Sequence, residues 1–134
     1  MDQTVLERTD SDPKAAYGAR IQRMRDAVAL KQPDRVPFYV SSRFWAARRQ
    51  GMTCEQAMYD GDGLSKATKA MLLEFDPDFY QLPHQQVVVG APLETLGFKA
   101  VKWPGHGVHE DVSFQYLDTE FMSAEEYDEY LTDP

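Results

Sequence analysis

The sequence predicts an α/β fold whose first two strands run parallel to each other. A helix with one apolar stripe precedes a first strand candidate at residues 35–40. Further helical segments separate this strand from a second candidate at residues 79–82. A strand, crossover helices and another strand are typical of a parallel βαβ unit. The chain has 134 residues, which is room for one domain and not for two ordinary ones.

The first helix is predicted to begin at residues 11–13, where Ser and Asp precede Pro13. A small polar residue caps a helix well, and a proline has no N–H to leave unpaired in the first turn. The stripe that follows has steps of four, three and four: Tyr17, Ile21, Met24 and Val28. We expect the helix to end before Pro33, because a residue that precedes proline avoids the helical conformation.

Helical signals fill the stretch between the two strand candidates. A short helical turn at residues 44–50 is ended by Gly51, and Thr53 with Gln56 forms a capping box that opens the next helix. Residues 60–63 are predicted to break the chain. An amphipathic helix then continues to Phe75, where an Asp-Pro-Asp sequence stops it.

The chain after residue 82 is rich in glycine and proline and is predicted to be an irregular extension. Two more strands are predicted at residues 98–103 and 112–117. A last helix is predicted from its cap at Ser123 through Leu131. We expect the side chains of Tyr116, Tyr127 and Tyr130 to pack. Two parallel strands do not make a stable sheet alone. We therefore expect the first part of a larger α/β domain, with a short natural protein as the alternative.

Charge and composition exclude several classes of protein. The net charge is −8, and residues 110–134 carry nine acidic residues and no lysine or arginine, which disfavours broad nucleic-acid binding. A single cysteine, Cys54, rules out an internal disulfide and a zinc site built mainly from cysteines. No stretch is apolar enough to span a bilayer, and the polar residues 1–12 do not resemble a secretory signal. We expect a cytoplasmic protein.

Three stretches together resemble a known family. A helix runs into Pro-Asp-Arg-Val-Pro-Phe at residues 33–38, residues 51–60 lead into the helix that ends at Asp-Pro-Asp, and Gly-His-Gly-Val at residues 105–108 precedes the acidic helix. These resemble the N-terminal part of the uroporphyrinogen decarboxylase superfamily. That superfamily includes the decarboxylase of haem (porphyrin) biosynthesis, a lyase, and corrinoid- or cobalamin-dependent methyltransferases. The resemblance implies a (β/α)₈ TIM barrel.

The resemblance sets the expected domain boundaries and the branch of the family. Residues 1–12 would be a flexible N-terminus, and residues 13–134 a partial barrel with its N-terminal helix, two or three strands and their helices, without the C-terminal part. The decarboxylase carries an arginine-rich, glycine-containing motif after its first strand, which residues 41–49 lack. We therefore favour the methyltransferase-like branch. Zinc or a corrinoid would belong to a full-length parent, and no cofactor is expected within this chain.

Two residues are candidates for substrate binding, because active sites of such barrels lie at the carboxyl ends of the strands. Arg43 follows the first strand and could hold a carboxylate through two hydrogen bonds, or it is a surface arginine. His84 follows the second strand and could donate to a substrate or exchange a proton, or it is a loop histidine. His106 and His109 are weak metal candidates with Glu110 or Asp111, because their stretch is predicted to be a loop.

The expected function is that of an N-terminal segment of a protein acting on a tetrapyrrole or corrinoid, free or protein-bound, by decarboxylation or methyl transfer. We identify no catalytic residue and expect little or no activity from this chain alone. The alternative is a short non-catalytic module with a half-barrel fold that pairs with another chain. Exposed edges of such a half-barrel would suit a partner, including a second copy in a homodimer.

Overall fold

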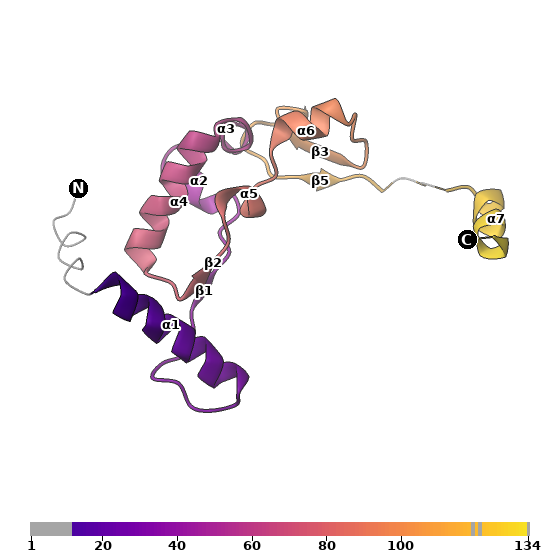
Figure 1. The fold of residues 1–134 in the computed structure, drawn as a ribbon. Helices are drawn as coiled ribbons and strands as arrows, with labels where there is room; N and C mark the ends of the chain where they lie inside the picture. Colours follow the sequence, from indigo (N-terminus) through magenta and orange to yellow (C-terminus); the bar gives the residue numbers. More distant parts are fainter. Residues whose placement is uncertain (1–11, 119, 121, 134) are drawn as a thin grey trace.

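The computed structural model of the chain describes residues 12–118, 120 and 122–133, and has a mixed α/β fold (Figure 1). The expected flexible segment at residues 1–12 lies outside the described residues except for Asp12, which caps the first helix. In chain order the elements are α1 Pro13–Val28, β1 Tyr39–Val40, α2 Trp45–Arg49, α3 Cys54–Tyr59, α4 Gly61–Phe75, β2 Phe79–Tyr80, α5 Pro83–Gln86, α6 Gly90–Thr95, β3 Val101–Pro104, β4 Gly107–Val108, β5 Gln115–Tyr116 and α7 Ala124–Thr132.

Helix α1 begins where the sequence predicts and ends earlier. The Asp12 carboxylate accepts a hydrogen bond from the Lys14 amide at 3.0 Å, and Pro13 occupies the first turn. The predicted end before Pro33 is wrong, because the helix stops at Val28. Leu30 adopts a left-handed conformation with φ of 57°, which turns the chain away from the helix axis before Pro33 is reached.

Strands β1 and β2 form the predicted parallel pair. Tyr39 lies opposite Phe79 and Val40 opposite Tyr80, and helices α2, α3 and α4 make the crossover between the strands. The strands are only two residues long, shorter than the predicted 35–40 and 79–82. Pro37 precedes the paired segment, in keeping with its missing N–H. The βαβ unit that the sequence predicts is therefore confirmed.

The crossover helices surround the core. The capping box is confirmed, since the Gln56 amide donates to the Thr53 hydroxyl at 3.0 Å and the Gln56 side chain accepts from the Thr53 amide at 2.9 Å. The predicted break at residues 60–63 is confirmed in shorter form. Helix α3 ends at Tyr59, and the Asp60 carboxylate accepts from the Gly63 amide and caps α4, which begins at Gly61. The buried core cluster consists of Phe44, Ala47, Cys54, Ala57, Met58, Leu64, Val87 and Trp103.

The chain after β2 has more regular structure than the sequence predicts. Helices α5 and α6 were not predicted, whereas the strand candidates at 98–103 and 112–117 are confirmed as β3 and β5 in shorter form. Strand β3 lies between β4 and β5, antiparallel to β5 with Val101 opposite Tyr116. Trp103 and Val101 of β3 enter the core, so this small sheet covers one end of the helices.

Helix α7 is confirmed with its capping box at Ser123, but it stands apart from the rest of the fold (Figure 1). None of its residues is buried. The expectation that the late tyrosines pack is wrong: Tyr116, Tyr127 and Tyr130 are 78%, 54% and 57% exposed. Among the helices between residues 13 and 132, none has both the length and the apolar character needed to cross a membrane.

Candidate functional site

The loops that follow β1 and β2 lie at one edge of the parallel pair. Parallel strands bring their carboxyl ends to the same edge, and in α/β folds this edge commonly carries ligand sites. Arg43 comes three residues after the end of β1, and His84 comes four residues after the end of β2. Both residues predicted from the sequence therefore belong to this edge.

The side chain of Gln86 joins the two loops. Its Oε1 accepts hydrogen bonds from the Ser42 amide at 2.6 Å, the Ser42 hydroxyl at 2.7 Å and the Arg43 amide at 3.1 Å. Its Nε2 donates to the Gln81 carbonyl at 3.0 Å. One amide group thus ties the loop after β1 to the loop after β2. Sequence analysis missed Gln86, since nothing local distinguishes it from other glutamines.

Arg43 has an unusual backbone and an exposed side chain. Its φ is 46°, a left-handed conformation that non-glycine residues adopt at an energetic cost. The bond from its amide to Gln86 helps to hold that conformation. In the part of the chain that the structure describes, the Arg43 guanidinium takes part in no hydrogen bond or ion pair, which leaves its donors open to solvent.

His84 lines a small cavity beside α3, α4 and α5. The cavity has a volume of about 190 Å³, and its polar wall consists of His84, Tyr59 and Ser65. The rest of the wall is mostly apolar: Ala57, Met58, Gly61, Leu64, Pro83, Val87 and Val89. Arg43 is not part of the wall. The structure therefore brings Arg43 and His84 to one edge but not into one cavity.

Tyr59 also belongs to a cluster with Glu94, Trp103 and His106. Its hydroxyl donates to Glu94 and accepts from Trp103 Nε1 at 3.2 Å, and His106 Nδ1 lies 3.4 Å from it. His106 Nε2 lies 3.2 Å from Glu94, and the imidazole stacks on the Trp103 ring. Burial and the hydrogen bond to Glu94 raise the pKa of Tyr59 above its usual value. Sequence analysis did not foresee this cluster, whose members come from α3, α6, β3 and the turn between β3 and β4.

The two weak metal candidates have other partners. His106 contacts Tyr59 and Glu94, while the ring of His109 accepts from the Asp111 amide at 3.2 Å, within its own loop. Across residues 12–118, 120 and 122–133, no three His, Cys, Asp or Glu side chains are grouped so that they could hold a metal ion. Cys54 is 2% exposed, and its thiol lies 3.5 Å from the Asp111 carbonyl.

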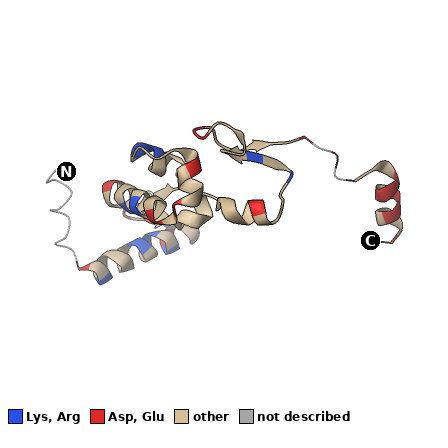
Figure 2. Ribbon diagram, turned by 90° about the horizontal axis from the view of Figure 1, so that it is seen from above, with Lys and Arg blue, Asp and Glu red and all other residues tan. Residues whose placement is uncertain are grey.

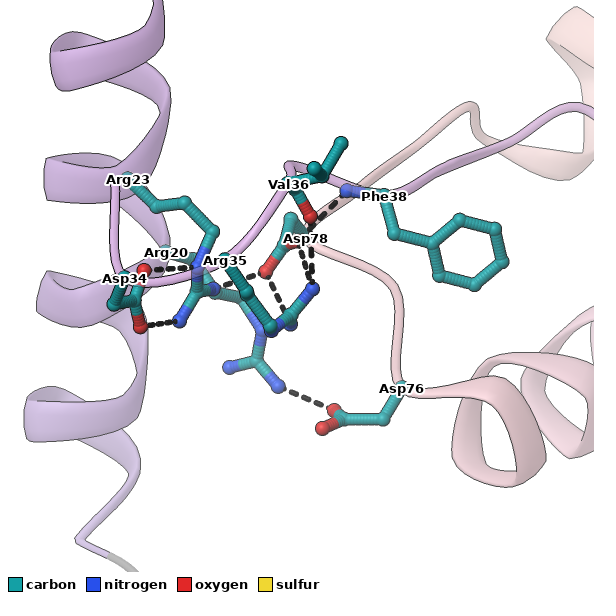
Figure 3. Close-up of polar contacts among 8 residues, drawn as sticks. All are labelled: Arg20, Arg23, Asp34, Arg35, Val36, Phe38, Asp76 and Asp78. Carbon is teal, nitrogen blue, oxygen red and sulfur yellow. Dashed lines mark hydrogen bonds and ion pairs between the residues drawn. The ribbon is translucent and has the colours of Figure 1, made fainter. Parts of the chain in front are cut away.

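A second polar cluster joins α1 to the start of β2 (Figure 3). Arg23 pairs with Asp34 through two hydrogen bonds of 2.6 and 2.7 Å and also donates to Asp78. Asp78 further accepts from Arg35 at 2.6 and 2.7 Å and from the Phe38 amide at 2.8 Å. Two of the stretches behind the family resemblance, Pro-Asp-Arg-Val-Pro and Asp-Pro-Asp, thus contact each other directly.

The carboxylates of this cluster are held in their charged form. Burial by itself raises the pKa of Asp78, but the Phe38 amide and the Arg23 guanidinium outweigh it and leave the pKa below its usual value. The hydrogen bonds from Arg23 lower the pKa of Asp34 in the same way. The members bond to one another, and the cluster therefore fixes the position of α1 and of the segment before β1 relative to the start of β2.

No protein-family model matches the chain, and no curated protein or solved structure shows significant similarity to it.

Proposed function

We propose that the chain forms the first strand–helix units of a uroporphyrinogen-decarboxylase-like (β/α)₈ barrel, whose parent protein acts on a tetrapyrrole or corrinoid. The observation that carries the proposal is the edge of the parallel pair, where Gln86 bonds the loop of Arg43 to the loop that bears His84. An edge of this kind is where such barrels build their sites.

The exposed guanidinium of Arg43 suits a carboxylate. Arginine binds carboxylates with two parallel hydrogen bonds, and the acetate and propionate arms of biosynthetic tetrapyrroles are carboxylates. In a decarboxylase Arg43 would hold such an arm in place while the protonated pyrrole ring takes up the electron pair that remains when carbon dioxide leaves. The cavity beside His84, at about 190 Å³, has room for one arm and not for a whole macrocycle.

Methyl transfer in this family uses zinc to activate a thiol or a corrinoid to carry the methyl group. The residues described here offer no set of three metal-ligating side chains, so we assign no zinc chemistry to them. For either reaction, the role that we propose for this segment is to anchor a carboxylate through Arg43 and to contact the bound ligand through His84.

The proposal is tested by titrating the purified chain with uroporphyrin and, separately, with hydroxocobalamin, followed by fluorescence and absorbance. We expect uroporphyrin to bind, and Arg43→Ala to weaken binding about tenfold or more, equivalent to about 1.4 kcal/mol. Arg25→Ala is the matched control, since Arg25 is an exposed arginine on α1. The proposal would be contradicted if neither ligand bound, or if Arg43→Ala and Arg25→Ala lost the same amount of affinity. Turnover of a tetrapyrrole by this chain alone would contradict the separate expectation that the chain is inactive.

A second candidate is a non-catalytic module that pairs with another chain. It is favoured by the exposure of aromatic side chains on the parallel pair, where Tyr39, Phe79 and Tyr80 are 44%, 54% and 46% exposed. Under this candidate Arg43→Ala leaves all solution behaviour unchanged, while Tyr39→Ser weakens self-association measured by light scattering. Dependence of ligand binding on Arg43 would favour the first candidate.

A further inference from the structure

An apolar groove and helix α7 lie at opposite ends of the molecule. The groove lies between α1, the end of α4 and β2, has a volume of about 720 Å³, and is called the α1–β2 groove below. Its apolar wall includes Tyr17, Ile21, Leu72, Leu73, Phe79 and Leu82. Tyr17 and Leu73 are 65% and 56% exposed, so this wall faces solvent in the single chain.

Helix α7 has the apolar stripe of a docking helix but covers nothing. Tyr130 and Leu131 lie three and four residues after Tyr127, so the three side chains share one face of the helix. They are 54%, 57% and 76% exposed. An amphipathic helix that presents anchors at this spacing is the usual ligand of an apolar groove.

The charges of the two surfaces are complementary. Helix α7 carries four acidic residues and no basic one: Glu125, Glu126, Asp128 and Glu129. In the groove Arg20 pairs with Asp76, and Asp78 pairs with Arg23 and Arg35, which leaves Lys69 as the basic side chain that faces an acidic partner. Lys69 takes part in no ion pair among the described residues. Figure 2 shows acidic positions along α7 and basic positions along α1.

Helix α7 lies at the opposite end of the molecule from the groove of its own chain, so it does not occupy that groove. In both ribbon views α7 and α1 lie at opposite ends of the molecule, and in Figure 1 the small sheet lies on the side of α7 (Figures 1 and 2). A second copy removes this difficulty. Each of two chains can place its α7 in the partner's groove, and such a reciprocal exchange closes with twofold symmetry.

We propose that the chain forms a homodimer by reciprocal exchange, in which α7 of each copy occupies the α1–β2 groove of the other. Neither Arg43 nor His84 lines the groove, so this homodimer does not depend on the role proposed for those two residues. Its partner is a second copy of this chain and not an unknown protein.

The mass of the intact chain, measured by sedimentation equilibrium over a wide range of concentration, is the first test. We expect twice the chain mass, and about a tenfold or greater increase in the dissociation constant for Leu131→Asp on α7 and for Leu73→Asp in the groove. Leu96→Asp is the matched control, because Leu96 is also 76% exposed and belongs to neither surface. Lys69→Glu should weaken the dimer, and Lys66→Glu, three residues earlier on α4, should not.

A cross-linking experiment identifies the occupant of the groove. A photoreactive benzoylphenylalanine replaces Tyr130, and equal amounts of isotopically heavy and light chains are mixed before irradiation. Cross-links that join a heavy and a light peptide, with the target in residues 69–82, support the exchange. A monomeric mass, cross-links only within one chain, or a dimer unaffected by both Leu131→Asp and Leu73→Asp would overturn it.

Discussion

Arg23 on α1 and Asp78 at the start of β2 form a hydrogen-bonded ion pair across 55 positions of the chain. The Asp78 carboxylate is fully buried, and the Arg23 side chain is 7% exposed. Removing one partner of a buried pair is costly, because the other charge stays buried without full compensation.

Asp78→Asn should lower the free energy of unfolding by about 2 kcal/mol, less than the full cost of isolating a buried charge, because Arg23 keeps its bonds to Asp34. Urea unfolding followed by circular dichroism measures the change. The control is Asp76→Asn, which breaks the half-exposed pair with Arg20 and keeps a residue that tolerates the left-handed conformation of this helix cap. The control should lose less than about 1 kcal/mol; equal losses would contradict the assignment.

The same cluster should make stability depend on acid. The pKa values of Asp78 and Asp34 are lower in the folded chain than in the unfolded one. Their contribution is therefore complete above the ordinary unfolded-state pKa of about 3.9 and is lost as the pH falls through the folded-state values. The stability difference between wild type and Asp78→Asn should stay constant near neutral pH and shrink below about pH 4. A difference unchanged in strong acid would refute this linkage.

Gln86→Ala should loosen the loop after β1. It leaves the amides of Ser42 and Arg43 without their acceptor, which costs about 1–2 kcal/mol. Hydrogen exchange of these two amides should speed up more than that of the core amides. Gln32→Ala, at an exposed position, is the control and should leave both exchange rates unchanged.

Gly90→Ala should disturb the Tyr59 cluster. A Cβ atom at Gly90 would lie 2.2 Å from the Tyr59 ring, so the ring must shift, and its contacts with Trp103 and His106 must change. We expect loss of stability and a changed environment of the Trp103 indole, measured by the chemical shift of its N–H. Gly61→Ala is the control, because a Cβ there meets nothing within 4 Å. An unchanged indole signal in Gly90→Ala would show that the packing is looser than described.

Local signals explain which elements could be predicted. The caps at Asp12, Thr53 and Ser123 involve neighbours two or three residues away, so the sequence reveals them directly. The break predicted at residues 60–63 is limited to Asp60, because the Asp60 side chain caps α4 and lets the glycine-containing stretch that follows begin a helix. Helix α5, with four residues, is too short to leave a periodic pattern.

The candidate site was predictable only in part. The positions of Arg43 and His84 follow from strand order, since parallel strands share a carboxyl edge. The contacts of Gln86, Tyr59 and Asp78 join residues 35 to 55 positions apart, and no local pattern encodes such pairs. The tyrosines of α7 were expected to pack because aromatic residues usually do, yet the single chain offers them no surface.

The amide of Gln86 also has a consequence for the order of assembly during synthesis. The Ser42 and Arg43 donors emerge from the ribosome 44 and 43 positions before their acceptor. Until residue 86 has left the exit tunnel, a nascent chain therefore lacks the group that holds Arg43 in its left-handed conformation. The loop after β1 should thus be among the later parts of this region to take its final shape, and truncation before residue 86 should leave it unformed.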